Sequence, residues 1–477
     1  MKTRERYDVV IVGTGPAGIF SAYELSRLTP ELNVLMVDMG GDLDSRRCPR
    51  SENGSCLACE PCALLSGWGG AGAFSDGKLC LSTEVGGYLA SYIGREALKE
   101  LVDYIDSVFV KFGAPNNLYR PDEEVVRELQ KKAVLANLRF TPYMVRHLGS
   151  DNCKKVLSCL RNYLSTKVDI LFNTKVERIL VKNGVVRGVK LADGREVNAK
   201  YVVVAPGRIG ASWLRREMER LGIKTYSGVV DIGVRVEVHA SITEELTQTV
   251  YDPKFIFYSK TFDDKVRTFC FCPNGEVITE TYHNVVTVNG HSYANKQTEN
   301  TNFAILVSTR FEEPLLNPIT YTLNIARLAN NIAGGKPIIQ RLGDLIRGRR
   351  STEERIKRSI IEPTLKDVTP GDLSYVFPYR YLLDIIEMLK ALNNVIPGIY
   401  SDHTLLYGVE LKLYSSRLKL TPELETEVKN LFAIGDGAGV TRGLVQAAAS
   451  GVLVARNIAK RVESNLFTHA PPNKVTV

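Results

Sequence analysis

The spacing of apolar residues near the start of the chain changes twice, from that of a strand to that of a helix and back. Residues 7–12 form a largely apolar run, which is typical of a buried strand. A glycine turn follows, then apolar residues at helical spacing through IFSAYELSRL, and a second apolar run, NVLMVD, ends at Asp38. The pattern predicts a strand, a glycine turn, a helix and a second strand, the order of a parallel βαβ unit.

The turn between the first strand and the helix reads GTGPAG and has the spacing GxGxxG. Gly13 permits the tight turn, Gly15 lets backbone amides approach a pyrophosphate, and Gly18 lets the helix pack closely on the strand. Asp38 can accept hydrogen bonds from ribose hydroxyls, and its charge would repel a 2′-phosphate. We predict a dinucleotide site formed by Gly13, Gly15, Pro16, Ala17, Gly18 and Asp38. The alternative is a glycine-bearing turn without a ligand.

A second glycine turn lies near the other end of the chain, in NLFAIGDGAGVTRGLVQAAASG. Residues 431–434 predict a strand, and a long helix with an alanine-rich face follows. Asp436 can accept hydrogen bonds from ribityl hydroxyls, and the amides between Gly439 and Thr441 can stabilise negative charge at flavin N1 and C2=O. NAD has no ribityl chain, so the two turns together predict FAD, bound at this end by Gly435, Asp436, Gly439, Val440 and Thr441. The alternative is an Asp436 that caps a helix in an ordinary βα unit.

Three strand-like runs lie between residues 176 and 204. Asn183-Gly184 and Asp193-Gly194 separate them, and both dipeptides are strong hairpin signals. The third run ends in VVVAPG, and a helix is expected near Ile209. A β-meander that returns to a glycine turn is typical of FAD proteins of the glutathione-reductase-like fold group.

With these three sections the chain resembles that fold group and, more narrowly, a family described as FAD-dependent dehydrogenases or uncharacterised FAD-dependent proteins. The resemblance covers nearly the whole chain and rests on the stretches GWGGAGAFSDGKL, VDIGVRVEV, TFCFCPNGEVI, TVNGHSYANKQTENTNFAILV, GDLSYVFP and GDGAGVTRGLVQAAASG. It implies an α/β fold with an FAD-binding Rossmann-type (glutathione-reductase-like) parallel sheet and a β-meander, plus an α+β substrate or cap domain. It also implies that Val176 offers backbone groups to the adenine. It supplies no substrate.

The middle of the chain alternates strand-like and helical runs without a second GxGxxG after a strand. We expect an FAD-binding domain in two parts, 1–227 and 398–477, and a substrate or cap domain over 228–397. An internal nicotinamide domain is not expected. Electrons would then come from NAD(P)H acting as an external reductant or from another protein.

Four cysteines stand close together in RRCPRSENGSCLACEPC, with the spacing C-x7-C-x2-C-x2-C. Four thiolates at short spacing can hold tetrahedral zinc or an iron–sulfur cluster. The C-x2-C-x2-C part has the spacing of bacterial ferredoxins, but the fourth cysteine lies upstream instead of downstream. The candidate ligands of zinc or an iron–sulfur cluster are Cys48, Cys56, Cys59 and Cys62. The alternative is four reduced thiols in a loop.

A glycine-rich run at residues 67–77 follows these cysteines. Backbone that carries few side chains can lie against an isoalloxazine ring, and we expect this of Gly69, Gly70, Ala71 and Gly72. Asp76 and Lys78 bring charges to the same neighbourhood. Lys78 is a candidate catalytic residue.

Cys270 and Cys272, in CFCPNGE, are further catalytic candidates. On a regular strand they point to opposite faces, so one surface receives both only where a bulge intervenes. A thiol beside a flavin can serve as an acid, a nucleophile or a charge-transfer partner, but cysteine is also a common small core residue. The six histidines show no close pairing at metal-ligand spacing.

Composition narrows the class of protein. With 477 residues, 44% hydrophobic and 24% charged, the chain is typical of a soluble globular protein of two or three domains. Its net charge of +8 favours a mildly anionic partner, but the densest basic run, RGRRSTEERIKR, carries acids at helical spacing. We expect a solvated helix face there in preference to a nucleic-acid-binding patch, which is the alternative. No signal peptide or membrane-spanning run is recognisable, which predicts a cytoplasmic protein without a membrane partner and with reduced thiols.

These features predict an FAD-dependent oxidoreductase that passes hydride between flavin N5 and a small organic substrate, with an external electron donor. Two alternatives stay open: a flavin-dependent RNA-modifying enzyme, and an electron-transfer flavoprotein without small-molecule turnover. The substrate, the electron donor or acceptor, the catalytic acid or base and the oligomeric state do not follow from the residues.

Overall fold

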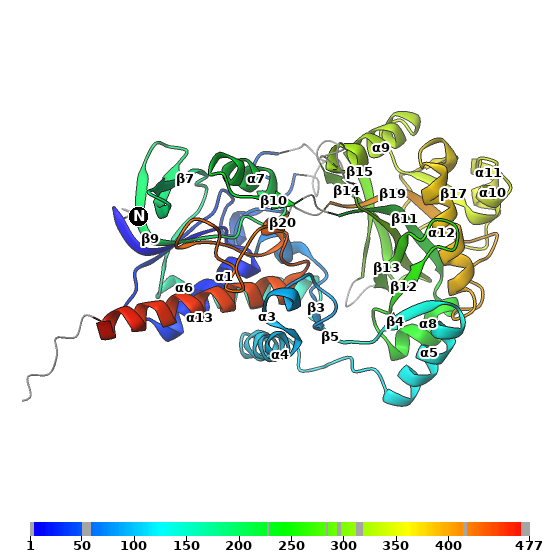
Figure 1. Cartoon of the computed structure of the whole chain (residues 1–477). Coiled ribbons are helices and arrows are strands. Elements are labelled where there is room, and N and C mark those ends of the chain that lie inside the picture. Colours follow the sequence, from blue (N-terminus) through cyan, green and yellow to red (C-terminus); the bar gives the residue numbers. More distant parts are fainter. Residues whose placement is uncertain are drawn as a thin grey trace, which may run out of the picture. The chain divides into compact units, whose positions relative to one another are not determined.

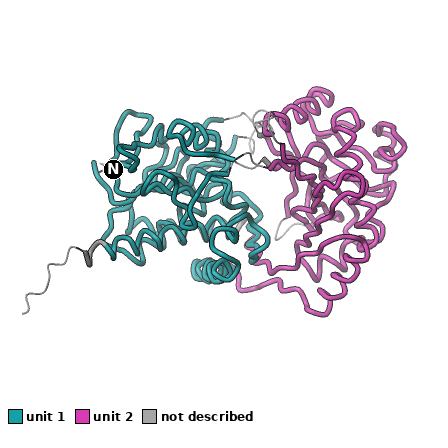
Figure 2. Tube along the Cα trace, viewed as in Figure 1, with its two compact units in different colours: residues 1–114, 152–226, 415–477 teal, residues 115–151, 227–414 magenta. Residues whose placement is uncertain are grey.

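The computed structural model describes residues 4–49, 59–226, 229–282, 285–292, 297–311, 318–413 and 417–468. Figure 2 shows that the chain forms two compact units. Unit 1 combines residues 1–114, 152–226 and 415–477, and unit 2 combines residues 115–151 and 227–414. These units differ from the predicted domains in two places: residues 115–151 contribute to unit 2, and the last part of unit 1 begins at residue 415 instead of 398.

The core of unit 1 is a seven-stranded sheet with the order β6-β2-β1-β9-β8-β7, in which β21 also pairs with β9. The parallel part contains β1 (Arg6–Val12), β2 (Val34–Val37), β6 (Asp169–Leu171) and β21 (Leu431–Ala433). The antiparallel meander contains β7 (Val176–Lys182), β8 (Val185–Leu191) and β9 (Glu196–Val204). Since β9 also runs parallel to β1, the meander is continuous with the parallel sheet. The predicted Rossmann-type fold with a β-meander is confirmed.

The hairpin between β7 and β8 forms where the sequence predicts it. Asn183 has φ +53° and Gly184 has φ +72°, so both central residues adopt the left-handed conformation that a type I′ turn requires. This turn has the twist that two paired strands need, and β7 and β8 pair from Val176 to Leu191.

Two long helices of unit 1, α1 (Pro16–Leu28) and α13 (Leu444–Thr468), pack against each other (Figure 1). A Cβ atom on Gly451 would lie 2.1 Å from the Ala17 carbonyl oxygen, so only glycine permits this approach. The other helices are α3 (Ala90–Ile93), α4 (Arg95–Lys111), α6 (Ser150–Ser165), which belongs to unit 1 from residue 152, and α7 (Ala211–Arg220). Short elements are η1 (Leu43–Ser45), η2 (Gly70–Phe74), η4 (Asp436–Ala438), β3 (Lys78–Leu81), β10 (Thr225–Tyr226) and β20 (Arg417–Leu418).

Unit 2 is built on an eight-stranded sheet with the order β18-β17-β19-β11-β16-β13-β12-β4. Its strands are β4 (Leu138–Thr141), β11 (Val230–His239), β12 (Lys254–Tyr258), β13 (Lys265–Cys272), β16 (Asn300–Thr309), β17 (Ile338–Arg341), β18 (Thr369–Pro370) and β19 (Leu405–Leu413). Further elements are β5 (Met144–His147), the hairpin of β14 (Glu276–Tyr282) and β15 (Val285–His291), and helices α5 (Glu123–Leu135), α8 (Ala240–Thr249), α9 (Pro318–Ile332), α10 (Leu342–Ile346), α11 (Glu353–Lys357) and α12 (Tyr379–Leu392), with η3 (Leu373–Tyr375). All pairings within the sheet are antiparallel except β17–β18. This confirms the predicted α+β architecture.

Within the described ranges, no helix combines the length and apolar character needed to cross a membrane.

Candidate functional site

The glycine turn after β1 is close-packed at two of its three glycines. A Cβ atom on Gly13, which has φ +106°, would lie 2.1 Å from the Ala205 carbonyl oxygen, and one on Gly18 would lie 2.0 Å from the Gly13 carbonyl oxygen. Gly15 is different, because the nearest atom to a Cβ built there is the Gly70 Cα, at 3.9 Å. Gly15 therefore leaves space beside the start of α1.

The N-terminus of α1 is suited to an anion. Gly15 is its N-cap, and no side chain caps that end of the helix. Pro16, at the first helical position, has no amide hydrogen to leave unpaired. The amides that follow, beginning at Ala17, can donate hydrogen bonds to the oxygens of a pyrophosphate, and the helix dipole favours negative charge there. The uncapped N-terminus of α1 is therefore compatible with the predicted pyrophosphate contact.

Asp38 has a role other than the one predicted from the sequence. Its Oδ2 accepts hydrogen bonds from the Thr14 amide at 2.8 Å and the Thr14 hydroxyl at 2.9 Å. Its Oδ1 accepts from the amides of Gly40 and Gly67, both at 2.8 Å. A carboxylate offers about four acceptor positions, and all are used within the protein. The buried Asp38 thus joins the glycine turn to the start of the 67–72 loop, and its contact with a ribose stays a prediction.

The 67–72 loop lies against both glycine turns of unit 1. The Gly69 amide donates to the Thr14 carbonyl at 2.8 Å, and a Cβ on Gly70 would lie 3.1 Å from the Gly15 Cα. A Cβ on Gly72 would lie 2.7 Å from the Leu444 side chain, at the start of α13. Ala71, between them, is half-buried in η2. The loop therefore stands beside the N-termini of α1 and α13, where a flavin contact was predicted.

Arg46 holds this loop in place, although no sequence pattern predicts this role. Its guanidinium donates to the carbonyl oxygens of Ala63, Leu64, Trp68 and Gly70. Burial lowers the pKa of Arg46 to about 10, against the opposing effects of Asp38 and Cys62. One buried cation thus orders a glycine-rich loop whose carbonyl groups would otherwise lack partners.

The turn between β21 and α13 presents an acceptor and two donors. Asp436 Oδ1 accepts from the Thr441 hydroxyl at 2.8 Å and from the Gly443 amide at 3.3 Å, while Oδ2 receives no hydrogen bond from the described residues. Burial raises the pKa of Asp436, and Arg208, Thr441, Gly443 and Arg442 act in the opposite direction. The amides of Val440 and Thr441 have no acceptor within the described part of the chain. These groups can bind a ligand that carries hydroxyls and a polarisable carbonyl.

The same turn packs onto the first glycine turn and onto residues 86–88. A Cβ on Gly435 would lie 3.1 Å from the Ala17 Cβ. The Val440 carbonyl accepts from the Tyr88 amide at 2.8 Å, and Gly439, with φ +72°, adopts the left-handed conformation. The two glycine turns, which lie over four hundred residues apart in the sequence, are thus direct neighbours in unit 1.

Val176 begins β7, close to the same end of the sheet. Thr174, two residues earlier, donates its amide to the Asp38 carbonyl at 2.9 Å. Val176 is buried and pairs with Leu191. Its predicted contact with an adenine is compatible with this position and stays a prediction.

The clustered cysteines are described only in part. Cys56 lies outside the described residues, so the four-cysteine site stays a prediction. Cys48 and Cys62 are half-buried and Cys59 is exposed. The Cys62 carbonyl accepts from the Ser66 amide at 3.0 Å and from the Ser66 hydroxyl at 2.6 Å, which connects the cysteine segment to the 67–72 loop.

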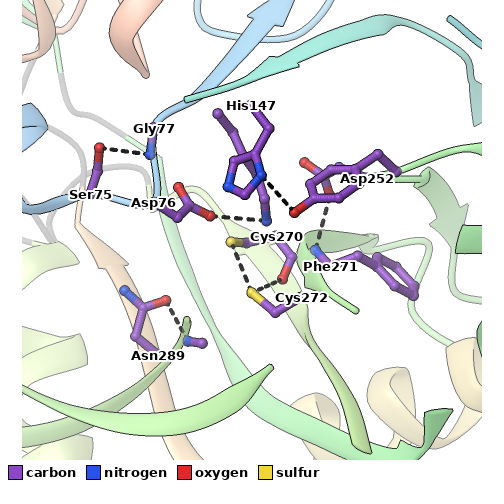
Figure 3. Close-up of polar contacts among 12 residues, drawn as sticks. Ser75, Asp76, Gly77, His147, Asp252, Cys270, Phe271, Cys272 and Asn289 are labelled. Carbon is purple, nitrogen blue, oxygen red and sulfur yellow. Dashed lines mark hydrogen bonds and ion pairs between the residues drawn. The ribbon is translucent and has the colours of Figure 1, made fainter. Parts of the chain in front are cut away.

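The three catalytic candidates divide between the units. In unit 1, Lys78 is buried in β3 and forms an ion pair with Asp76 at 3.0 Å. In unit 2, the sulfur atoms of Cys270 and Cys272 lie 3.8 Å apart at the end of β13 (Figure 3). The pairing of β13 with β16 shifts register between Phe269 and Cys272, so the bulge that one shared surface requires is present.

Comparison with known proteins finds matches to two family models and to one similar protein. Residues 230–412 match the model of "FAD-dependent protein, C-terminal domain-like", and residues 362–465 match that of "Glucose inhibited division protein A". An uncharacterized protein of Clostridium beijerinckii is 27% identical over 490 residues, which cover 95% of this chain and 81% of that protein. The family matches confirm the resemblance to FAD-dependent proteins that the sequence predicts.

Similar solved structures include formate oxidase, with a TM-score of 0.45 and 11% identity over 98% of this chain and 100% of that chain. Quinol fumarate reductase FrdA from E. coli has a TM-score of 0.44 and 13% identity over 99% of this chain and 72% of that one. Glycine oxidase from Geobacillus kaustophilus has a TM-score of 0.39 and 12% identity over 98% and 96% of the two chains. All three likenesses are distant, and no activity is inferred from them.

Proposed function

We propose that this FAD-dependent protein is an oxidoreductase that passes hydride between flavin N5 and a small organic substrate. FAD, when bound, supplies a two-electron acceptor and donor whose chemistry belongs to the cofactor, while the protein binds and orients it. The observation that carries the proposal is the convergence in unit 1 of the Gly13–Gly18 turn, the 67–72 loop and the Gly435–Gly443 turn.

The groups at these three segments fit the parts of FAD. The uncapped N-terminus of α1 suits the pyrophosphate, and the space beside Gly15 admits it. The Oδ2 of Asp436, which receives no hydrogen bond from the described residues, suits a ribityl hydroxyl. The amides of Val440 and Thr441, which have no acceptor in the same part of the chain, suit an acceptor on the pyrimidine ring. NAD would use the first of these sites and leave the second without a partner, which favours the flavin nucleotide.

The protein's contribution to the reaction is charge stabilisation at that turn. Amides directed at a position where negative charge develops lower the energy of the charged form, and they act more strongly where water is excluded. Asp436 fixes the turn through the hydroxyl of Thr441 and the amide of Gly443, so that the neighbouring amides stay available. We propose an external electron donor, NAD(P)H or another protein, because the sequence has no second dinucleotide motif.

The role of Asp436 can be tested by replacement with Ala and Asn. Loss of a hydrogen bond to a charged group costs about 1.5–3 kcal/mol, so we expect FAD to bind Asp436→Ala about tenfold more weakly or worse. Asp436→Asn, which keeps an acceptor, should lose less. Asp193→Asn, on an exposed hairpin of the same unit, is the matched control. Wild-type FAD affinity in Asp436→Ala would contradict this assignment.

Turnover can be tested by anaerobic titration of the purified holoprotein. The visible flavin absorbance should bleach on addition of NADH, NADPH or an organic donor such as an amino acid or hydroxy acid, and return on addition of an organic acceptor. Bleaching by protein donors alone, with no organic donor or acceptor active, would favour an electron-transfer flavoprotein and overturn the proposed activity.

A further inference from the structure

The end of β13 brings two thiols together that a regular strand would separate. The pairing of β13 with β16 shifts register between Phe269 and Cys272, and Cys270 lies at φ +49°, in the left-handed region that non-glycine residues rarely adopt. As a result both sulfur atoms lie on the same side, 3.8 Å apart (Figure 3). Bulges of this kind re-aim side chains and often occur at functional sites.

The bulge is held by buried polar groups. The Phe271 amide donates to Asp252 Oδ1 at 2.9 Å (Figure 3). Asp252 also accepts hydrogen bonds from the Tyr143 hydroxyl at 2.7 Å and from the Lys254 ammonium at 2.8 Å. The Phe271 ring is buried and stacks on Phe303, with 4.4 Å between ring centroids. Phe271 lies between the two cysteines, with its amide bonded to Asp252 and its ring packed on Phe303. These contacts fix the strained backbone of the bulge.

A buried arginine lies against the pair. Arg235, with no exposed surface, donates through Nη2 to the Cys270 carbonyl at 2.8 Å and to the Cys272 sulfur at 3.2 Å. A guanidinium in contact with a sulfur favours the thiolate, which is the reactive form. A Cβ on Gly290 would lie 1.6 Å from Arg235 Nη2, so Gly290 makes room for this contact. Glu410 lies 3.5 Å from Arg235 Nη1, and Lys412 lies 3.0 Å from Glu410.

The two sulfurs differ in exposure. Cys270 is half-buried, whereas Cys272 is fully buried beside Arg235. We propose that Cys270 and Cys272 form a redox-active dithiol that is oxidised to a disulfide by thiol–disulfide exchange with a low-molecular-weight disulfide. To reach a disulfide length of about 2.05 Å the sulfur atoms must approach by roughly 1.8 Å, which side-chain rotation can supply.

The exchange takes two steps. The Cys270 thiolate attacks one sulfur of the small disulfide, forms a mixed disulfide and releases one small thiolate. The Cys272 thiolate then attacks the Cys270 sulfur, forms the Cys270–Cys272 bond and releases the second small thiolate. The two protons of the protein thiols pass to the two released thiolates, so the dithiol loses two electrons and the small disulfide gains them. This site lies within unit 2 and goes beyond the proposed flavin function, because no step requires the flavin.

The experiment uses the purified holoprotein, glutathione disulfide as the probe, and intact-mass and peptide mass spectrometry. We expect the wild type to lose the mass of two hydrogen atoms, with the linkage mapped to the 270–272 peptide, and to recover on reduction. Cys272→Ser should stop at a glutathione adduct on Cys270, and Cys270→Ser should leave Cys272 unmodified. Cys159→Ser, which removes an exposed thiol elsewhere, is the control and should behave as the wild type at this peptide.

Arg235 is assigned a positioning role with its own readout. Arg235→Gln should prolong the lifetime of the mixed disulfide on Cys270 without slowing its formation, and Arg235→Lys should restore the second step in part. If Arg235→Gln does not fold, the adducts formed by the two cysteine variants test the proposal. Absence of the 270–272 linkage in the wild type, or an equal adduct on Cys272 in Cys270→Ser, would overturn the proposal. Loss of stoichiometric zinc in a Cys270→Ser/Cys272→Ser double variant would instead make the pair a metal ligand set and also overturn it.

Discussion

Replacement of Gly15 by Ala separates cofactor binding from folding. Gly15 has φ −75° and ψ −178°, a conformation that alanine adopts readily. A Cβ there has one neighbour within 4 Å, the Gly70 Cα at 3.9 Å, so the methyl group meets no clash within the described protein. It would, however, occupy the space beside the uncapped end of α1, where we place the pyrophosphate. We expect normal folding and weaker FAD binding.

The magnitudes follow from these contacts. Exchange of Gly for Ala at a compatible helix N-cap changes stability by within about 1 kcal/mol. An extra methyl group in a close-packed contact costs about 1–3 kcal/mol, which corresponds to a Kd for FAD raised about 5- to 150-fold. The assays are urea unfolding of the apoprotein and titration of the apoprotein with FAD, followed by flavin fluorescence.

Gly18→Ala is the matched comparison. Its Cβ would lie 2.0 Å from the Gly13 carbonyl oxygen, so α1 must move away from β1, and we expect the apoprotein itself to lose about 1–3 kcal/mol or more. The reasoning is refuted if Gly15→Ala binds FAD with wild-type affinity, or if its apoprotein is destabilised as much as that of Gly18→Ala.

Three further predictions concern other parts of the chain. Arg46→Met leaves buried carbonyl oxygens of the 63–70 segment unpaired, at about 1–3 kcal/mol each, so hydrogen exchange there should accelerate and FAD occupancy should fall; the exposed neighbour variant Arg47→Met should show neither change. Burial, with a contribution from a neighbouring carboxylate, raises the pKa of Asp384 to about 7. Between the ordinary carboxyl pKa and about pH 7 the folded state therefore binds more protons than the unfolded state. The free energy of unfolding is highest below the ordinary carboxyl pKa and declines as the pH rises to about 7. Asp384→Asn should remove this decline and raise the free energy of unfolding at about pH 8 by about 1–3 kcal/mol. The free energy is measured by denaturant unfolding at about pH 5 and about pH 8. A difference between the two pH values that is the same in Asp384→Asn as in the wild type would count against the prediction. Protein purified without air should contain iron or zinc that Cys59→Ser loses, and the absence of both metals from the wild type would leave the clustered cysteines as reduced thiols.

The fold of unit 1 follows from short-range sequence patterns. The strand, glycine turn and helix around Gly13, the Asn183-Gly184 hairpin, and the strand and helix around Asp436 each depend on residues close together in the chain. Such local preferences agree with the final structure, and for this reason they can be predicted. The assignment of residues 115–151 to unit 2 depends on long-range pairing, such as that of β4 with β12, and local patterns do not contain it.

The candidate site was predictable only where backbone geometry requires particular residues. Glycines at close approaches were found, because only glycine fits there. The sequence motif places Asp38 beside the correct turn, but it does not reveal the hydrogen bonds that Asp38 accepts within the protein, and the predicted ribose contact stays a prediction. Arg46 was missed, since a single arginine in a loop gives no periodic signal. The sequence indicates only that Cys270 and Cys272 need a bulge to share one surface. It does not predict that the bulge is present, because a register shift depends on the partner strand.

The central claim is that the convergent turns of unit 1 bind FAD. The most direct measurement is the absorbance spectrum of the purified, undenatured protein, followed by heat release and mass identification of the bound chromophore. The account predicts the visible bands of a flavin and release of about one FAD per chain, reduced in proportion to affinity in Gly15→Ala and Asp436→Ala. A protein that carries no flavin and does not take up added FAD would contradict it.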